Sequence, residues 1–283
     1  MENKKHLVVG ANSFLAKQII LQINDNANVL GLYNNATNNF VNGVEYKNIS
    51  ELENLSDTFQ FVFIISAFIP QKNNVEDVEK LTQINENLTT IICAKFKTSK
   101  IIFASSVSVY AFDGLGKNEQ SICEPQTYYG ISKLNAENIV KHHLSYAIVR
   151  ISSMIGVGMK QTTFVPLIIS NAIKNNKITL LGDGSRSQNY IDVNDVATIF
   201  IEASKHTKNL VLLAASTMSF SNLEIANFIE KKLPNISISL ENTDNSPSFY
   251  YDATNTYKNI NFTPQKSIEN SITEIVEWQQ KIY

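Results

Sequence analysis

Cysteine, histidine and glycine are scarce in this 283-residue sequence, which holds two, four and ten of them respectively. Cys93 and Cys123 give neither a disulfide framework nor the paired spacing of a metal site. The histidines are scattered along the chain, so they offer no cluster of zinc ligands. The sequence therefore predicts a protein without structural disulfides and without a metal site.

An excess of charge of one sign is also missing. The 24 basic and 26 acidic residues leave a net charge of -2, without a long basic block. Binding to nucleic acid or to an anionic membrane therefore has no electrostatic support. The longest strongly apolar run, residues 61–69, is too short to cross a bilayer, and strand-like residues begin by His6, which leaves no room for a signal peptide. We expect a cytoplasmic protein.

Short apolar runs alternate with segments of helical periodicity along most of the chain. Expected strands are residues 6–10, 28–33, 44–47, 61–66, 101–106, 146–151, 178–181, 211–215 and 236–240. Expected helices are residues 14–23, 75–96, 128–142, 164–174, 193–203, 221–231 and 267–281. This alternation predicts an α/β protein with a Rossmann-type, doubly wound parallel sheet. Residues 241–251 are polar and rich in turn formers, which is typical of a segment that moves or closes over a site.

Tyr129 and Lys133 are the strongest candidates for catalysis. They stand four residues apart, so in a helix both side chains lie on one face and the ammonium can approach the phenol. A free tyrosine has a pKa near ~10, and a fixed cation together with an oxidised nicotinamide favours its phenolate. Tyr129 could then exchange a proton with a substrate oxygen while hydride moves at the carbon. Ser106, at the end of an apolar strand, is the third candidate.

The turn after the first strand is a candidate site for a dinucleotide. A pyrophosphate binds where a strand ends on glycine and a helix begins, because the helix N-terminus presents free N–H groups. Gly10, Ser13 and Ala16 occupy the three glycine positions of the usual motif. Alanine still permits close packing of helix and strand, whereas Ser13 places a side chain where bare backbone normally meets phosphate. The remaining candidates on this turn are Asn12, Phe14 and Leu15.

The ends of the following strands supply further candidates for cofactor binding. Asn34 and Asn35 stand where an acidic residue would normally hold the ribose hydroxyls of NAD. Because asparagine does not repel a 2′-phosphate, we expect a slight preference for NADP(H) over NAD(H). Asn48, Ser66 and Ala67 follow the next two strands and are also expected to face the cofactor.

Several motifs together resemble those of the extended short-chain dehydrogenases/reductases, specifically the NAD-dependent epimerase/dehydratase family that acts on nucleotide-linked sugars. The likeness covers Gly10 to Ala16, Ser105-Ser106 with Val109-Tyr110, Pro125 with Tyr129-Gly130 and Ser132-Lys133, Val149-Arg150, and the run from Leu181 to Ala197. The resemblance implies that Ser106, Tyr129 and Lys133 are the catalytic set, with the lysine also holding the nicotinamide ribose.

The resemblance also implies the division of the chain. We place the dinucleotide-binding domain at residues 1–155, with returning segments at about 188–215, and expect residues 156–283 to form mainly a smaller C-terminal lobe for a nucleoside diphosphate. Expected substrate contacts are Ser106, Ser153, Thr163, Phe164, Arg186 and Asn189. Arg186 is the local candidate for the diphosphate, since a guanidinium binds phosphate oxygens at two points. The family often has arginine in place of Gln188 and asparagine in place of Ser153, so the diphosphate contacts are expected to differ.

The residues bear on three activities of this family. The dehydratases carry an Asp-Glu pair beside the catalytic hydroxyl, whereas Val107 and Ser108 stand here, so dehydration is excluded. We favour reduction of a nucleotide-linked 4-keto-6-deoxysugar, narrowly, over 4-epimerisation with tightly bound NAD. A non-catalytic NAD(P)-sensing or scaffold protein and a reductase of a lipid or small ketone are the alternatives from other classes. Relatives are commonly homodimers joined through helices that correspond to residues 75–96 and 128–142.

Overall fold

A computed structural model of the protein describes residues 5–35 and 40–283. Seven parallel strands form the central sheet in the order β10-β6-β5-β4-β1-β2-β3. They are β1 (His6–Val9), β2 (Val29–Tyr33), β3 (Glu45–Asn48), β4 (Phe61–Ile64), β5 (Lys100–Ser106), β6 (Tyr146–Ile151) and β10 (Leu210–Ala214). The order reverses between β1 and β4, so the predicted doubly wound α/β fold is confirmed.

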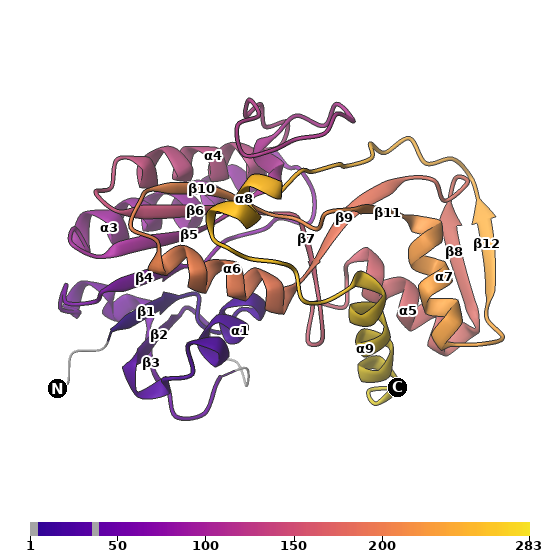
Figure 1. Ribbon diagram of the computed structural model, residues 1–283, viewed down its shortest axis with the longest axis horizontal. Helices are drawn as coiled ribbons and strands as arrows, with labels where there is room; N and C mark the ends of the chain where they lie inside the picture. The colour runs from indigo at the N-terminus through magenta and orange to yellow at the C-terminus, as the bar shows by residue number, and fades with distance from the viewer. Residues whose placement is uncertain (1–4, 36–39) are drawn as a thin grey trace.

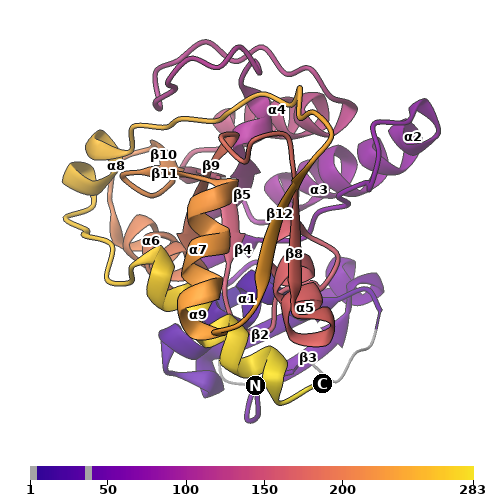
Figure 2. The same ribbon diagram turned by 90° about the vertical axis from the view of Figure 1, so that its right-hand side faces the viewer.

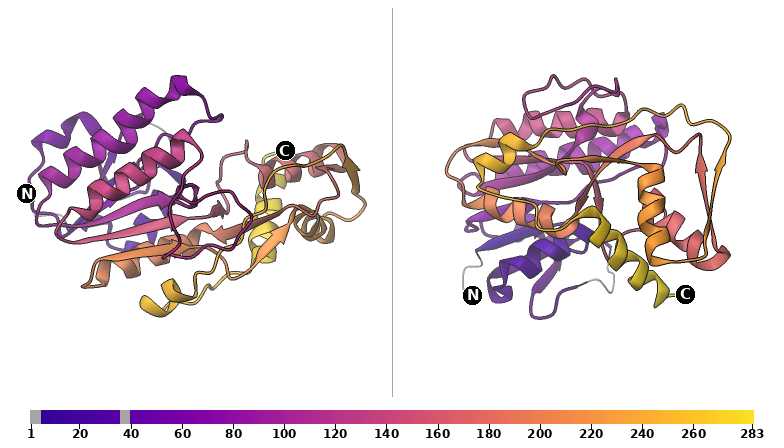
Figure 3. Two further views of the ribbon diagram at one scale, coloured as in Figure 1. Left: turned by 90° about the horizontal axis from the view of Figure 1, so that it is seen from above. Right: turned by 45° about the vertical axis from the view of Figure 1, so that its right-hand side comes forward.

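Helices cover both faces of this sheet (Figure 3, left). Alternate residues of each strand point to opposite faces, and both faces are apolar, as a buried parallel sheet requires. One face, with Val8, Phe63 and Ile102, packs on α1 (Phe14–Ile23) and α6 (Val193–Lys205). The other face, with Leu7, Val62 and Ile101, packs on α3 (Leu88–Lys95) and α4 (Tyr128–Lys141).

The helix expected over residues 75–96 is present but not uniform. It runs through η3 (Val75–Asp77), α2 (Val78–Leu81), the π-helical turn η4 (Thr82–Asn87) and α3.

Within the described residues, no helix is long and apolar enough to cross a membrane. The cytoplasmic location expected from the sequence stays a prediction.

A smaller lobe lies beyond one end of the sheet (Figures 1 and 2). It consists of α5 (Phe164–Asn175), β8 (Lys177–Leu181), α7 (Asn222–Lys232), β12 (Ser237–Glu241) and α9 (Ile268–Gln280). Strands β8 and β12 pair in parallel, and the three helices enclose a separate apolar core. The Phe14 ring packs against both this core and that of the sheet, so it joins the two parts.

A three-stranded sheet, ordered β11-β9-β7, links the lobe to the central sheet. Its strands, β7 (Ser153–Ile155), β9 (Ser187–Asp192) and β11 (Ser219–Ser221), were not expected from the sequence because they are short and largely polar. The short helix α8 (Thr254–Asn259) was also missed. Ile260 and Phe262 follow α8 and pack into the core of the large sheet. This segment therefore also returns to the sheet, in addition to the returning segments expected at about residues 188–215.

Candidate active site

Ser106 and Tyr129 meet where β5 ends and α4 begins. Ser106 is the last residue of β5, and its hydroxyl accepts a hydrogen bond from the Ser108 N–H at 3.1 Å, which caps the short helix η5 (Val107–Val109). Thr127 caps α4 by accepting from the Gly130 N–H at 3.0 Å. A Cβ at Gly130 would lie 2.2 Å from the Ser108 carbonyl oxygen, so glycine allows α4 to pack closely against η5. A hydrogen bond links the side chains of Tyr129 and Ser106.

The pKa of the Tyr129 phenol is raised, whereas the sequence predicted surroundings that favour the phenolate. Burial raises its pKa to about 12, although the hydrogen bond with Ser106 lowers it in part. Lys133 lies one helical turn further, with its Nζ 4.2 Å from the centroid of the Phe103 ring. Burial lowers the pKa of Lys133 itself to about 7, against the charge of Glu137, which raises it. In the protein alone, Tyr129 is therefore a protonated phenol rather than a phenolate, because desolvation outweighs any help from a partly neutral lysine.

A buried ion pair fixes the helix that carries these side chains. Glu137, one turn beyond Lys133 on α4, receives hydrogen bonds from Arg150 of β6 and from the Ser105 hydroxyl at 2.6 Å. Burial raises the pKa of Glu137, but the Arg150 guanidinium more than offsets this and holds it below its usual value. Arg150 also donates to the Tyr110 hydroxyl at 2.9 Å and to the Glu119 carbonyl at 3.2 Å. The pair thus ties α4 to β5 and β6 behind the catalytic face.

Asn85 secures the other side of α4 from within the π-helical turn. Its side chain is 1% exposed and donates to the Ser132 hydroxyl at 3.0 Å. It also accepts from the Phe68 N–H at 2.8 Å and donates to the Phe68 carbonyl at 3.1 Å. One amide therefore positions both the catalytic helix and the segment that follows β4. The periodicity of the sequence predicts a regular helix over residues 75–96, so it could not reveal the hydrogen bonds that Asn85 makes from the π-helical turn.

The turn between β1 and α1 fits a dinucleotide. Gly10 has a φ of +82°, and a Cβ there would lie 2.6 Å from the Ser66 amide nitrogen, so the turn can pass the end of β4 only with glycine. The Ser13 hydroxyl is turned onto α1, where it accepts from the Ala16 N–H at 3.3 Å as the N-cap. The first N–H groups of α1, which include those of Phe14 and Leu15, have no intrahelical acceptor and face outward at the carboxyl edge of the sheet. Because these N–H groups are available as donors, this edge of the sheet is suited to bind a pyrophosphate.

Asparagine side chains join the neighbouring strand ends. Asn12 donates to the Asn35 carbonyl at 2.7 Å, and Asn48 donates to the Asn34 carbonyl at 3.1 Å. Asn34 and Asn35 are exposed. Ser66 and Ala67 follow β4 directly, and the Ser66 N–H donates to the Val9 carbonyl at 2.9 Å. The structure therefore brings all the expected cofactor residues to one edge of the sheet; their contacts with a cofactor stay a prediction.

The expected substrate residues of the lobe are less closely grouped. Thr163 occupies the N-cap position of α5, but its hydroxyl donates to the Lys160 carbonyl at 3.2 Å, and the Phe164 ring packs on the lobe core. Arg186 donates to the Pro247 carbonyl at 3.3 Å and lies 4.0 Å from the Asp244 carboxylate, so it already has protein partners. The Asn189 amide accepts from the Ser152 hydroxyl at 3.0 Å and donates to the Ser216 carbonyl at 2.9 Å. Asn189 therefore holds neighbouring segments together, and its substrate role stays a prediction.

Two pockets flank Ser108, which lines both of them. The first, which we call the aromatic pocket, has a volume of about 150 Å³. It is lined by Val107, Ser108, Phe112, Ser153, Gln188, Asn189, Phe249 and Tyr251. The second, the tyrosine pocket, has a volume of about 200 Å³ and is lined by Ile69, Pro70, Gln71, Lys72, Asn73, Ser108, Thr127 and Tyr129. A substrate at the Ser106–Tyr129 pair could therefore extend to either side.

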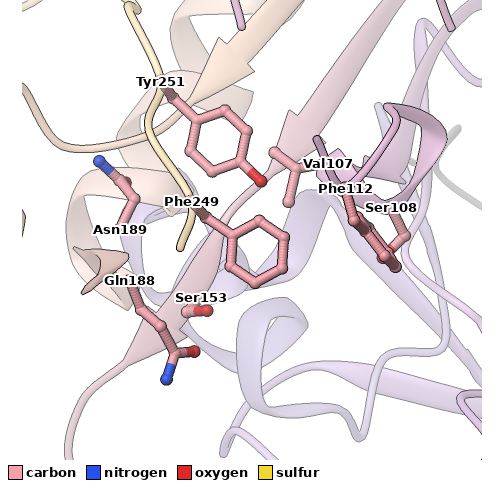
Figure 4. Close-up of a pocket in the computed structure, with 8 residues that line it drawn as sticks. All are labelled: Val107, Ser108, Phe112, Ser153, Gln188, Asn189, Phe249 and Tyr251. Carbon is pink, nitrogen blue, oxygen red and sulfur yellow. The ribbon is translucent and has the colours of Figure 1, made fainter. Parts of the chain in front are cut away.

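Phe112, Phe249 and Tyr251 line the aromatic pocket, and the sequence did not identify any of them as site residues. Figure 4 shows Phe249 and Tyr251 entering from one side, opposite Phe112 and Ser108. The Phe112 and Phe249 rings meet edge to face, with centroids 5.4 Å apart. The turn-rich composition of residues 241–251 predicted a segment that moves or closes over a site. It did not predict which side chains of this segment line the pocket.

Two chain segments form what we call the roof of the aromatic pocket, residues 111–127 and residues 248–256. The Lys117 N–H donates to the Tyr250 carbonyl at 3.0 Å, and the Asp252 N–H donates to the Lys117 carbonyl at 2.8 Å. The Glu119 carboxylate accepts from both the N–H and the hydroxyl of Thr256. Backbone pairing and one buried carboxylate thus fasten the two segments together.

Among residues 5–35 and 40–283, no group of three or more metal-ligating side chains occurs. The side chains of Ser106, Tyr129 and Lys133 offer a hydroxyl, a phenol and an amine.

Comparison with known proteins identifies related sequences. The family model described as "NAD dependent epimerase/dehydratase family" matches residues 6–212. A dTDP-D-glucose 4,6-dehydratase of Dictyostelium discoideum is 28% identical over 218 residues, which are 68% of this chain but only 49% of that protein. The chain thus spans about half the length of this relative. A candidate UDP-glucose 4-epimerase of Methanocaldococcus jannaschii is 24% identical over 97% of this chain and 98% of its own.

Solved structures share the fold at low identity. The UDP-glucuronic acid 4-epimerase of Bacillus cereus, in complex with UDP-glucuronic acid and NAD, superposes with a TM-score of 0.87. It is 18% identical, and the superposition covers 98% of this chain and 99% of that one. The whole described architecture, sheet and lobe together, therefore occurs in a protein that binds both a dinucleotide and a nucleotide sugar.

Proposed function

Because this chain belongs to the NAD-dependent epimerase/dehydratase family and is thus a nicotinamide-dependent enzyme of the extended short-chain dehydrogenase type, we propose that it reduces a nucleotide-linked 4-keto-6-deoxysugar. The observation that carries the proposal is the pairing of Tyr129 with Ser106 at the end of β5, where both hydroxyls can meet one ketone oxygen. A ketone being reduced must receive a proton on its oxygen, and a protonated phenol can supply it.

In the proposed reaction, Ser106 and Tyr129 both donate hydrogen bonds to the ketone oxygen and orient it. When bound, the nicotinamide supplies hydride to the carbonyl carbon. Tyr129 transfers its proton to the oxygen as negative charge develops there, and Ser106 stabilises that charge. Lys133 holds the nicotinamide ribose and, when protonated, stabilises the phenolate that remains.

The side chains around the reacting pair disfavour dehydration. Eliminating water from a sugar requires a further acid and base beside the catalytic hydroxyl. Val107 and Ser108 occupy the two positions after Ser106 and offer no carboxylate. Two carboxylates buried nearby hold protein groups, both oxygens of Glu137 with Arg150 and Oε1 of Glu119 with Thr256.

For the cofactor, we propose that the enzyme accepts both dinucleotides and slightly prefers NADP(H). The exposed end of β2 presents Asn34 and Asn35 to the adenosine ribose, and neither repels a 2′-phosphate. Fluorescence titration with NADPH and NADH tests this, with Asn34→Asp as the variant expected to shift the preference toward NADH. Much tighter NADH binding by the parent protein would contradict the proposal.

The second candidate is 4-epimerisation of a nucleotide sugar. It is favoured by the M. jannaschii relative, whose match covers almost the whole of both chains. An epimerase must first oxidise its substrate, for which Tyr129 has to act as a base, whereas a reductase needs Tyr129 as an acid.

We also propose that the enzyme is a homodimer that pairs through α3 and α4. Large apolar side chains are exposed on these helices, with Ile91 at 47%, Ile131 at 43% and Tyr128 at 36%. Light scattering on the purified protein tests this, and Ile131→Glu is expected to yield monomers.

The decisive assay incubates purified enzyme with NADPH or NADH and nucleotide-linked 4-keto-6-deoxyhexoses, and identifies the products by NMR. Oxidation of the cofactor in step with formation of a 4-hydroxy sugar is the expected result. No oxidation with any ketosugar, together with interconversion of UDP-hexoses, would establish the epimerase instead.

A further inference from the structure

The aromatic pocket adjoins the reacting groups directly. Ser108 lines it, and the Ser108 hydroxyl lies 3.1 Å from that of Ser106. If Ser106 binds the oxygen at the reacting carbon, a substituent on the next ring carbon reaches this pocket. Its volume of about 150 Å³ is below the ~300 Å³ of pockets for whole drug-sized ligands, so it suits one part of a sugar rather than a nucleotide.

One wall of the pocket is apolar. Phe112, Phe249 and Tyr251 present ring faces and edges, and Val107 adds aliphatic surface. Aromatic rings of this kind pack well against C–H groups and exclude water from what they contact. A methyl or hydroxymethyl group would bury apolar surface here.

The polar side chains of the pocket carry no charge. Ser108, Ser153 and Gln188 offer hydroxyl and amide groups, and Asn189 uses its amide on protein partners. Among the described residues that line the pocket, none is basic or acidic. Two cations of the surrounding segments lie near carboxylates, Lys117 at 2.6 Å from Asp113 and Arg186 at 4.0 Å from Asp244, and Lys72 lines the adjoining tyrosine pocket.

We propose that the aromatic pocket binds the uncharged substituent next to the reacting carbon, so that the enzyme acts on hexoses and 6-deoxyhexoses and rejects hexuronates. This inference rests on the proposed function, since it specifies the sugar for that site. A carboxylate in the pocket would lose its hydration without gaining a cation, which is strongly unfavourable. Gln188 lines the pocket from β9 and is the uncharged side chain at which a charge can be introduced as a test.

The test compares UDP-glucose with UDP-glucuronate, which differ only in this substituent, in the cofactor-bound enzyme by calorimetric titration. We expect the glucuronate to bind roughly 100-fold more weakly. Gln188→Lys should narrow the ratio of the two affinities at least tenfold, and Gln188→Glu should widen it. Gln280→Lys adds the same charge at an exposed position on α9, and should leave the ratio unchanged. Both ligands carry the same diphosphate, so the ratio of their two affinities cancels any effect of the new charge on that group.

Equal affinity for both ligands, with no response to either charge at position 188, would overturn the inference. If neither UDP-sugar nor a dTDP-linked 4-keto-6-deoxyhexose binds, the proposed function fails, and the pocket is then tested separately by saturation-transfer NMR with methyl glucoside and methyl glucuronide. Signals from the glucoside alone, lost in Phe249→Ala, would still support an uncharged pocket. Equal signals from both glycosides, unchanged in Phe249→Ala, would refute it.

Discussion

Glu137 and Arg150 form a two-point ion pair in the interior of the protein. Arg150 Nε lies 2.9 Å from Glu137 Oε1, and Arg150 Nη2 lies 2.7 Å from Glu137 Oε2. The side chains are 0% and 4% exposed. The same carboxylate raises the pKa of Lys133, so Glu137 both helps to fix α4 in place and helps to keep this lysine charged.

Breaking this pair should destabilise the protein strongly. Arg150→Met leaves the buried Glu137 charge with only the partly exposed Lys141 near it, and we expect a loss of about 3–5 kcal/mol in the free energy of unfolding. Lys141→Met is the matched control, because Lys141 contacts the same carboxylate at 3.6 Å from a partly exposed position. It should cost under about 1 kcal/mol. Urea unfolding measures both, and similar losses would show that the buried pair has no special role.

Tyr129→Phe should remove most turnover while leaving cofactor affinity unchanged. Only the proton transfer is lost, which predicts a fall in kcat of roughly 10²–10⁴-fold. Tyr128→Phe removes a hydroxyl from the adjacent, exposed residue and should retain activity. Steady-state kinetics and a cofactor titration on both variants provide the comparison. A fully active Tyr129→Phe enzyme would end the catalytic assignment.

Lys133→Met should stabilise the cofactor-free protein even though it abolishes activity. Lysine holds its proton up to about pH 10.5 in the unfolded chain, but only up to about pH 7 when buried here. The unfolded state thus binds more protons between these values, so the stability of the parent rises with pH across that window. At pH 7 the variant should be more stable by about 2–4 kcal/mol, and its advantage should shrink as the pH approaches 10.

Urea unfolding of the parent and Lys133→Met at neutral and alkaline pH tests this prediction. Lys80→Met is the control, because Lys80 also lies over a phenylalanine ring, Phe68 at 4.2 Å, but is exposed. Its stability relative to the parent should not change with pH. A Lys133→Met protein less stable than the parent at pH 7 would contradict the assigned pKa.

Gly10→Ala should disrupt the dinucleotide turn. The positive φ and the 2.6 Å approach to the Ser66 amide both oppose a side chain, at a cost of about 1–3 kcal/mol from the backbone alone. We expect dinucleotide affinity to fall at least tenfold in a titration. Gly116→Ala, where an added Cβ meets nothing within 4 Å, should leave both stability and binding as they are. If alanine is tolerated at position 10, the turn does not need glycine.

The sequence predicted those parts of the molecule that depend on local pattern. Helix α1 was expected at its observed bounds, since both its start after Gly10 and its apolar face are visible in the sequence. Parallel strands buried on both faces appear as apolar runs, which is why β1, β4 and β6 were found. Tyr129, Lys133 and Ser106 followed from helical spacing and from the end of a strand.

The remaining parts depend on contacts between distant segments. Phe112 and Phe249 share the aromatic pocket because their segments are joined by backbone pairing at Lys117 and by the hydrogen bond between Glu119 and Thr256, which are 137 residues apart. The raised pKa of Tyr129 reflects burial, which the four-residue spacing to Lys133 does not reveal. The pairing of Arg186 with Asp244 was likewise invisible, because the two residues lie on different loops.

The roof of the aromatic pocket imposes an order on how the protein becomes functional during synthesis. Strands β1 to β6, together with Ser106 and Tyr129, are complete once residue 151 has been made. Phe249, Tyr251 and Thr256 arrive about a hundred residues later, after β10 has completed the central sheet. The growing polypeptide thus contains Ser106, Tyr129 and Lys133 well before it contains the residues that complete the aromatic pocket.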